Sequence, residues 1–415
     1  MKSLWKIMPL VFVALLVASC DKQGGSKAGY QVEAFGFQEE EDGKWGIMDM
    51  DGNILVKPKF EYSPTAVING SFSIYNEDDG DYTLYSLVDN KPKKLGTFRD
   101  VGAFTGNLCP VFDEDGNCRY IDKEGKTVLD LEKFNGKHVV GAYNFFCGRA
   151  MLKLDNGKWG YIDEKGEAVI PFKYADAWNF AEDVGIVYHQ IPEGTDNAKW
   201  SLVDKDGNVL YTKKFRELSP NAYKYAGGYL TVNDRNGRSC IIDKKGEVVK
   251  KLKDDMNITD VPFNGKFIVY DANEGQFGLM DVEGNWVLKN KYESISYNGK
   301  LLAAASEEEK FSLFSLSGEK KGRLPRGYVI LFEPEFKNYD NRMLVGSYGS
   351  NFELLDGEGK KIGDGIEFAS YANHYYWGAA VEEEGEEYYE DYEEEDDDPD
   401  VEAYEEDEDI EDYED

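Results

Sequence analysis

Histidine is scarce in this chain, with only three residues in 415: His138, His189 and His374. They are far apart and lack the spacing of metal ligands, and none has a companion serine or cysteine motif, so neither a histidine-based metal site nor a catalytic triad is indicated. No Gly-rich phosphate loop precedes a helix, because the glycines occur in turn-like segments. The sequence therefore predicts no catalytic residue, no metal site and no enzyme activity.

Long apolar runs are also missing, apart from residues 7–18 near the start of the chain. That run is too short to span a bilayer, and the preceding Lys2 and Lys6 are typical of a targeting segment. Small residues then lead to Cys20, a pattern that resembles the lipobox of bacterial lipoproteins. The resemblance implies cleavage before Cys20 and acylation (for example by palmitate) of its thiol; an ordinary secretion signal is the alternative.

These features divide the N-terminus into a signal peptide (1–19) and a flexible tether (20–29). We expect the mature protein to be held at the cell envelope, in the outer membrane, by the lipid on Cys20. The membrane face is left open.

Cysteine is rare as well. Beyond Cys20 there are only Cys109, Cys118, Cys147 and Cys240, without a Cys-x-x-Cys spacing. Four cysteines in an exported protein allow three disulfide pairings, and Cys109 and Cys118 flank a turn across which they could face each other. Free buried thiols are equally compatible with a chain long enough to bury a large core.

Basic residues are absent from the C-terminus, where 24 of the 34 residues in 382–415 are Asp or Glu. Because the whole chain has a formal charge of −34 and the signal peptide of +2, residues 20–381 carry only −12. A segment so charged and so poor in aliphatic residues is expected to be a disordered tail. Binding to nucleic acid by phosphate neutralisation is not expected.

What the chain has in abundance is one recurring unit. Its clearest copies are residues 43–60 and 157–174, where Gly-Lys-Trp-Gly leads through a short apolar run to an Asp-x-x-Gly turn and a second apolar run. The pattern predicts a β-hairpin with aromatic and aliphatic anchors. The turn recurs about every 38 residues, at Asp49, Asp89, Asp122, Asp163, Asp204, Asp243, Asp281, Ser315 and Asp356.

A second block lies between the hairpins, as at 146–153 and 263–269, and reads as a Gly-containing turn followed by a β-rich run. Each unit therefore holds at least three strands, and no helical periodicity occurs. We predict an all-β fold of tandem hairpin or meander repeats. It is either β-propeller-like, closed by overlap of residues 30–37 with 377–381, or an open β-solenoid.

Gly-Lys-Trp-Gly-x-x-Asp-x-x-Gly followed by a β-branched run and Pro-x-x-Tyr/Phe resembles the WG-containing repeat (KWG repeat) family. The resemblance covers residues 30–368, so we define a repeat domain at 30–381. It implies β-propeller-like or stacked hairpin units in exported bacterial proteins, and it implies no shared catalytic residues.

The predicted site residues fall into two groups. Repeat anchors are expected to pack between units or to form the turns: Trp45, Trp159, Trp200, Phe277, Gly52, Gly166, Gly207 and Gly284. An aromatic patch could bind a sugar or peptide: His374, Tyr375, Tyr376 and Trp377. The Asp-rich turns resemble the start of calcium loops but lack the later ligands, so backbone-binding Asp turns explain them better.

The function that these features favour is a non-catalytic binding scaffold, lipid-anchored in the membrane, with an unidentified protein or glycan partner and no cofactor. Two alternatives stay open. One is a carbohydrate-active enzyme with carboxylate catalysis in a central cavity. The other is a calcium-dependent surface protein whose acidic tail binds Ca²⁺ weakly.

Overall fold

The computed structural model describes part of the chain. The described residues are 32–40, 43–190, 199–212, 217–218, 225–234, 236–259, 262–297, 301–306, 310–324, 329–330, 342–347, 350–356, 358–366, 368–370 and 378–380. By its internal packing the chain divides into Met1–Val381 and Glu382–Asp415, and every described residue belongs to the first unit. The expected signal peptide, Cys20, tether and acidic tail lie outside the described residues.

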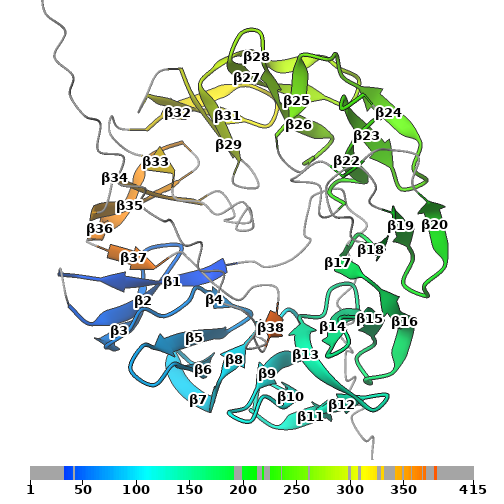
Figure 1. The fold of residues 1–415 in the computed structure, drawn as a ribbon. Helices are drawn as coiled ribbons and strands as arrows, with labels where there is room; N and C mark the ends of the chain where they lie inside the picture. Colours follow the sequence, from blue (N-terminus) through cyan, green and yellow to red (C-terminus); the bar gives the residue numbers. More distant parts are fainter. Residues whose placement is uncertain are drawn as a thin grey trace, which may run out of the picture. The chain divides into compact units, whose positions relative to one another are not determined.

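All regular elements in the described ranges are β-strands (Figure 1). Within those ranges, no helix with the length and hydropathy of a membrane span occurs. The strands of the first half are β1 (Val32–Gln38), β2 (Trp45–Asp49), β3 (Ile54–Phe60), β4 (Val67–Ile68), β5 (Ser71–Asn76), β6 (Asp81–Val88), β7 (Lys91–Phe98), β8 (Asp100–Val101), β9 (Cys109–Phe112), β10 (Cys118–Ile121), β11 (Thr127–Asp130), β12 (Lys133–Phe134), β13 (Lys137–Tyr143), β14 (Ala150–Leu154), β15 (Trp159–Ile162), β16 (Ala168–Tyr174), β17 (Asp176–Ala181) and β18 (Val184–Gln190).

The second half continues the same succession without interruption by another kind of element in the described ranges. Its strands are β19 (Lys199–Val203), β20 (Val209–Thr212), β21 (Glu217–Leu218), β22 (Tyr229–Asn233), β23 (Ser239–Asp243), β24 (Val248–Lys251), β25 (Met256–Ile258), β26 (Lys266–Asp271), β27 (Gln276–Asp281), β28 (Trp286–Tyr292), β29 (Ser294–Tyr297), β30 (Leu301–Ala305), β31 (Phe311–Ser315), β32 (Lys320–Arg323), β33 (Val329–Ile330), β34 (Arg342–Ser347), β35 (Ser350–Asp356), β36 (Lys361–Ile366), β37 (Phe368–Ser370) and β38 (Gly378–Ala380).

These strands repeat a four-stranded antiparallel meander, and β1 also pairs with β4, which joins the first two units into one sheet. Units β4–β7, β8–β11, β13–β16, β17–β20, β21–β24, β25–β28, β29–β32 and β33–β36 each follow chain order, and β12 adds to the edge of β13. The first unit takes its first strand from the C-terminal end, because β37 pairs with β1, which continues into β2 and β3. The described strands thus make nine units, each with one strand more than the three that the sequence required.

Each pair of consecutive units shares an apolar core. Between β17–β20 and β21–β24, for example, Trp200 and Leu202 pack with Leu230 and Cys240. A cluster of Phe35, Phe37, Phe352 and Ile366 likewise joins the last unit to the first. The chain's last unit and its first are therefore connected both by strand pairing and by a core. The fold is all-β and β-propeller-like, and the open solenoid is not what forms.

The middle strands are buried on both faces. Along β30, Leu302 and Ala304 belong to the core shared with the preceding unit, while Leu301 and Ala303 belong to the core shared with the following one. Successive side chains of a strand point to opposite faces, so a strand between two neighbours must be apolar at every position. This explains the unbroken Leu-Leu-Ala-Ala-Ala run of β30.

The repeat signature has a register that explains its aromatic residues. Trp159 of β15 lies opposite Tyr174 of β16, at the end of the Pro-x-x-Tyr stretch. Trp45 pairs with Phe60 in the same way, and Phe277 with Tyr292. In each copy the register then shifts, so the fourth strand bulges where its Pro or equivalent residue lies.

The glycine after the tryptophan is required by that bulge. A Cβ on Gly160 would lie 2.8 Å from the carbonyl oxygen of Ile170, and one on Gly46 would lie 2.7 Å from that of Val56. Real Cβ atoms do not approach backbone oxygen so closely. The two residues of the Trp-Gly pair therefore act together. The aromatic residue pairs across to the fourth strand, and the glycine leaves room for the bulge of that strand.

The Asp of the turn binds the turn's own backbone. Oδ1 of Asp163 accepts hydrogen bonds from the N–H groups of Lys165 and Glu167 at 3.0 Å each. The same arrangement occurs at Asp49, Asp122, Asp204, Asp243 and Asp356. At Ser315 the hydroxyl oxygen takes the acceptor's place, with Glu319 as donor. An Asp turn, rather than a calcium loop, accounts for these copies.

Three details differ from an expectation or decide between alternatives that the sequence left open. Asp89 forms no such turn: it and Asn90 both have positive φ (49° and 57°), which is a two-residue hairpin turn between β6 and β7. Cys109 and Cys118 do not face each other, because Cys109 pairs with Ile121 and Cys118 with Phe112; both are free and buried, as is Cys240.

The third difference concerns closure of the repeat array. The strand that pairs with β1 is β37, not the segment 377–381. Residues 378–380 form β38, which pairs with β13 instead.

We predict that Gly160→Ala destabilises the protein by about 1–3 kcal/mol, because the new methyl group must displace the bulged strand β16. Gly106→Ala is the matched control, since a Cβ there meets nothing within 4 Å. Chemical denaturation of both variants measures the difference. Equal midpoints for Gly160→Ala and the wild type would contradict the close approach.

A second prediction concerns the turn carboxylates. Burial raises the pKa of Asp204, but hydrogen bonds from the side chain and backbone of Asn208 outweigh it, so the pKa lies below its ordinary value of 3.8; Asp281 is held low in the same way by Asn285. Carboxylates with a depressed folded-state pKa stabilise the fold above pH 3.8 and lose this contribution as the pH falls through the folded value.

The double variant Asp204→Asn, Asp281→Asn should therefore melt below the wild type at pH 7, and the gap should narrow as the pH falls below about 4. Thermal unfolding across pH 3–7 provides the measurement. A gap that stays constant with pH would show that these charges do not contribute.

Candidate functional site

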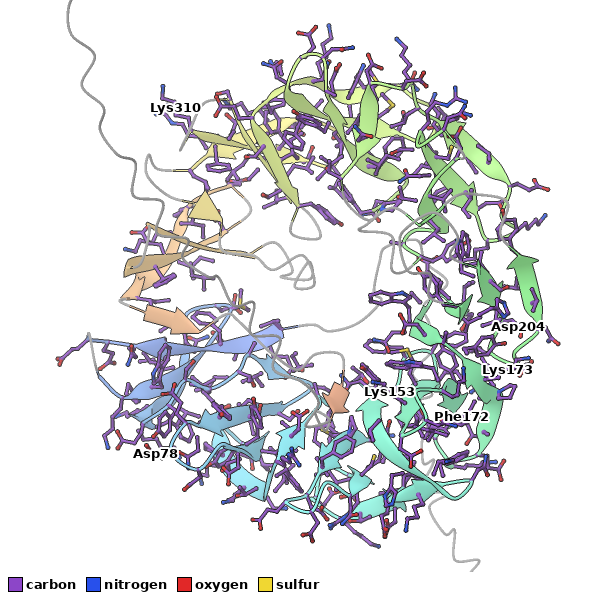
Figure 2. All side chains as sticks on the ribbon, in the orientation of Figure 1. Asp78, Lys153, Phe172, Lys173, Asp204 and Lys310 are labelled. Carbon is purple, nitrogen blue, oxygen red and sulfur yellow. The ribbon has the colours of Figure 1, made fainter. Side chains whose placement is uncertain are left out.

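One group of partly exposed side chains stands out from the repeated, structural ones. It gathers where β17 packs beside β14 and β15 of the preceding unit (Figure 1). We call it the Asp176 cluster, and it consists of Tyr143, Lys153, Trp159, Asp176, Trp178 and Tyr188, of which Lys153 is labelled in Figure 2.

Local structure places the β17 members of the cluster. Asp176 begins the strand and lies opposite Tyr188 of β18. Because side chains alternate, Trp178 emerges on the same face as Asp176, whereas Ala177 turns into the core. The hydroxyl of Tyr161 donates a 2.7 Å hydrogen bond to the carbonyl oxygen of Trp178, which fastens β17 to β15.

The preceding unit supplies the other members. Lys153 and Trp159 are cross-strand partners on β14 and β15. The rings of Tyr143 and Trp159 pack with centroids 5.4 Å apart. Trp178 is 37% exposed, so part of its ring is accessible. The cluster therefore presents aromatic surface from two units together with a carboxylate and an amine.

Burial perturbs the titratable groups of the cluster. It raises the pKa of Asp176, against which the N–H of Ala177 and the charge of Lys153 act to lower it. Burial, with smaller effects of Asp176 and Asp100, raises the pKa of Tyr143 to about 12. The pKa of Tyr188 is also raised to about 12, chiefly by burial, although a hydrogen bond with the Trp178 side chain opposes this.

The side chains of the Asp176 cluster are suited to binding a ligand by non-covalent contacts. The two tyrosine hydroxyls stay protonated at neutral pH and can donate or accept hydrogen bonds. The rings can stack on an apolar or sugar surface or attract a cation, and Asp176 can accept hydrogen bonds or pair with a positive charge. Oδ1 of Asp176 already accepts the N–H of Ala177 at 2.8 Å, which orients the carboxylate.

A histidine–serine pair escaped sequence reasoning. Nε2 of His189 lies 2.8 Å from Oγ of Ser201, on the neighbouring strands β18 and β19. No sequence motif connects them, because antiparallel pairing alone brings them together. Ser201 is only 1% exposed, so its hydroxyl has no open path to a substrate, and the pair orders the strands rather than forming an accessible nucleophile.

The repeat anchors lie in three environments. Trp200 is fully buried in the core between two units, with its ring 5.8 Å from that of Tyr211. Trp159 and Phe277 are half-buried against inter-unit cores, and Trp45 is half-buried opposite Phe60. Of these four residues, Trp159 alone contributes to the Asp176 cluster.

The turn glycines all adopt the left-handed conformation that their turns need: φ is 83° at Gly52, 81° at Gly166, 80° at Gly207 and 95° at Gly284. The lipidation residue Cys20 and the aromatic patch His374, Tyr375, Tyr376 and Trp377 lie outside the described residues. Apart from Trp159, the members of the Asp176 cluster were missed because the cluster draws on five strands; only the mixed polar and aromatic start of β17 signals them in sequence.

No group of three or more potential metal ligands occurs within the described part of the chain. The acidic tail, where weak Ca²⁺ binding was considered, is not among the described residues.

Comparison with solved structures supports the fold. The chain is similar to a eukaryotic initiation factor, with a TM-score of 0.56 and 12% identity over 82% of this chain and 99% of the other. It is also similar to BamB from Moraxella catarrhalis (TM-score 0.37, 11% identity, 66% and 96% covered) and to AztD from Citrobacter koseri (TM-score 0.37, 13% identity, 80% and 94% covered). At 12% identity, the likeness to the initiation factor is one of fold alone.

Sequence comparison addresses the repeats directly. No curated protein matches the chain. The model of the WG-containing repeat matches residues 45–70 and 159–189, which include the Trp-Gly strands β2 and β15 and the bulged strands that follow them. The chain therefore carries WG-containing repeats, and the resemblance expected from its sequence is confirmed.

Proposed function

We propose that this protein is a non-catalytic binding scaffold of the bacterial cell envelope that holds a protein or glycan partner at the Asp176 cluster. The observation that carries the proposal is Trp178, which is 37% exposed on β17 and forms a side-chain hydrogen bond with Tyr188 of β18. Exposed aromatic side chains next to a charged group are typical of recognition sites. The repeated polar residues, by contrast, are engaged in turns.

The proposed location follows from the N-terminus. Cys20, preceded by small residues and an apolar run, would carry the lipid that anchors the protein in the outer membrane. A lipid anchor concentrates a scaffold at a surface without consuming any part of the repeat domain. The net charge of −34 favours partners other than nucleic acid.

A carbohydrate-active enzyme is the second candidate, and one observation favours it. Burial raises the pKa of Asp176, as catalysis by a general acid requires. Asp100 occupies the corresponding start of β8, and its Oδ1 accepts the N–H of Val101 at 2.7 Å, as Asp176 accepts that of Ala177. Both carboxylates thus serve their own strands, which favours a structural and binding role.

We predict that Cys20→Ser removes the protein from the membrane fraction and abolishes incorporation of labelled fatty acid, because the acylated thiol is lost. Ser26→Ala, in the same tether, is the control and should behave as the wild type. Fractionation of cells that express each form tests this. Continued labelling of Cys20→Ser would overturn the anchoring assignment.

We predict that Trp178→Ala weakens partner binding at least about tenfold, as truncation of a central aromatic contact does. Val248→Ala is the control, since Val248 is 50% exposed on β24, far along the chain from the cluster. Pull-down from envelope extracts, with the mature protein bearing or lacking residues 382–415, identifies the partner, and titration measures the affinity.

Two results would count against the scaffold. One is unchanged affinity of Trp178→Ala while the protein keeps its melting temperature. The other is release of reducing ends from envelope glycans by the wild type but not by Asp176→Asn, which would favour the enzyme instead.

A further inference from the structure

Trp178 offers a ligand an aromatic surface whose polar group is already used. The indole N–H is the only hydrogen-bonding group of a tryptophan side chain, and in Trp178 it is engaged in a side-chain hydrogen bond with Tyr188. Because 37% of Trp178 is exposed, part of its ring remains accessible on β17. Such a surface stacks on C–H groups or on another ring instead of donating a hydrogen bond.

Polar side chains lie on the same face as this indole. Asp176 is two residues earlier on β17, and Tyr188 is its cross-strand partner on β18. Besides burial, which acts most strongly, the charge of Lys153 lowers the pKa of Asp176, and the charge of Asp176 raises the pKa of Tyr143. Both side chains of the preceding unit therefore lie near this carboxylate, and the site combines a carboxylate, an amine and two phenolic hydroxyls.

These groups supply both kinds of hydrogen-bond partner. The amine of Lys153 (Figure 2) only donates, the carboxylate of Asp176 only accepts, and a tyrosine hydroxyl does both. The N–H of Ala177 uses one of about four acceptor positions of Asp176, which leaves capacity for a ligand. The hydroxyl of Tyr188 accepts from the indole and keeps its own O–H as a donor. A ligand with several hydroxyl groups matches this set.

The charges of the cluster balance. Lys153 is positive and Asp176 negative, while Tyr143 and Tyr188 stay protonated at neutral pH, because burial raises the pKa of each to about 12. Asp100 also acts on Tyr143, but it is only 9% exposed and does not reach a ligand. A cationic ligand would meet the amine, an anionic ligand would meet the carboxylate, and a purely apolar ligand would bury both without hydrogen bonds.

We propose that the Asp176 cluster binds a neutral glycan, with one sugar ring stacked on Trp178 and its hydroxyl groups hydrogen-bonded by Asp176 and Lys153. This inference rests on the proposed scaffold function and names the chemical class of its partner. A neutral sugar complements the cluster in both respects. Its C–H groups pack on the indole, and its hydroxyl groups donate to the carboxylate and accept from the amine and the tyrosines.

The first experiment determines the class of the partner. Envelope extract is treated with periodate, which cleaves the vicinal diols of sugars, or with protease, and is then offered to the immobilised mature protein. Capture should be lost after periodate, kept after protease and reduced by Trp178→Ala. It should also be the same at low and high salt, because binding of a neutral ligand pairs no net charge.

The second experiment uses defined probes in calorimetric titration: two neutral tetrasaccharides, of glucose and of N-acetylglucosamine, one anionic, of galacturonic acid, and one cationic, of glucosamine. A neutral probe should bind the wild type at least about tenfold more tightly than either charged probe. Lys153→Met leaves the carboxylate unbalanced and should shift the preference towards the cationic probe. Asp176→Asn should shift it towards the anionic probe. Lys245→Met is the control, since Lys245 is exposed in the turn after β23.

Three results would count against the proposal. Capture that depends on Trp178 but survives periodate and is lost after protease would show a protein partner, so the glycan would be wrong while the scaffold function stands. Failure of both neutral probes to bind more tightly than the charged ones would also overturn the glycan. Capture that is indifferent to Trp178→Ala would instead remove the scaffold function at this cluster, and the glycan with it.

Discussion

Burial of the middle strands on both faces is the constraint on which this structure depends. A residue such as Ile241 packs into the core shared with the following unit, while its neighbours Cys240 and Ile242 pack into the core shared with the preceding one. No unit can bury its apolar side chains alone, so each is stable only between two others. An end unit without a neighbour would expose such a face, and the cluster of Phe35, Phe37, Phe352 and Ile366 removes that exposure by joining last to first.

The repeat signature is explained by this requirement and by the local geometry of one hairpin. The tryptophan and the Tyr or Phe that ends the unit are cross-strand partners, the glycine admits the bulge between them, and the Asp binds the turn. Each conspicuous residue of the motif therefore has a structural task. Recognition is left to residues that the units do not share, such as Asp176 and Trp178.

Tyr143 connects the Asp176 cluster to the end of the described repeat array. It ends β13, where its backbone pairs with Gly378 of β38, while its ring packs on that of Trp159 of β15. The cluster therefore lies beside the place where the last described strand joins the β13–β16 unit.

Local features of the chain were readable from the sequence because they depend on neighbouring residues. The hairpin with its Asp turn, the strand that follows a Gly-containing turn and the period of about 38 residues all rest on local spacing, and these led to an all-β, propeller-like fold. The prediction of an Asp turn at Asp89 was wrong, because a two-residue turn of Asp89 and Asn90 also has an Asp at that position of the repeat.

Only the tertiary structure decided what depends on residues far apart in the chain. In the folded protein, β37 pairs with β1 and completes the first unit, whereas β38 pairs with β13. It also buried Trp200 while leaving Trp159 half-exposed, although both occupy the same place in their hairpins. The reason is physical: hairpin geometry is set by a few adjacent residues, whereas closure, burial and the Asp176 cluster are set by which neighbour packs against each strand, and the repeat pattern is the same for every neighbour.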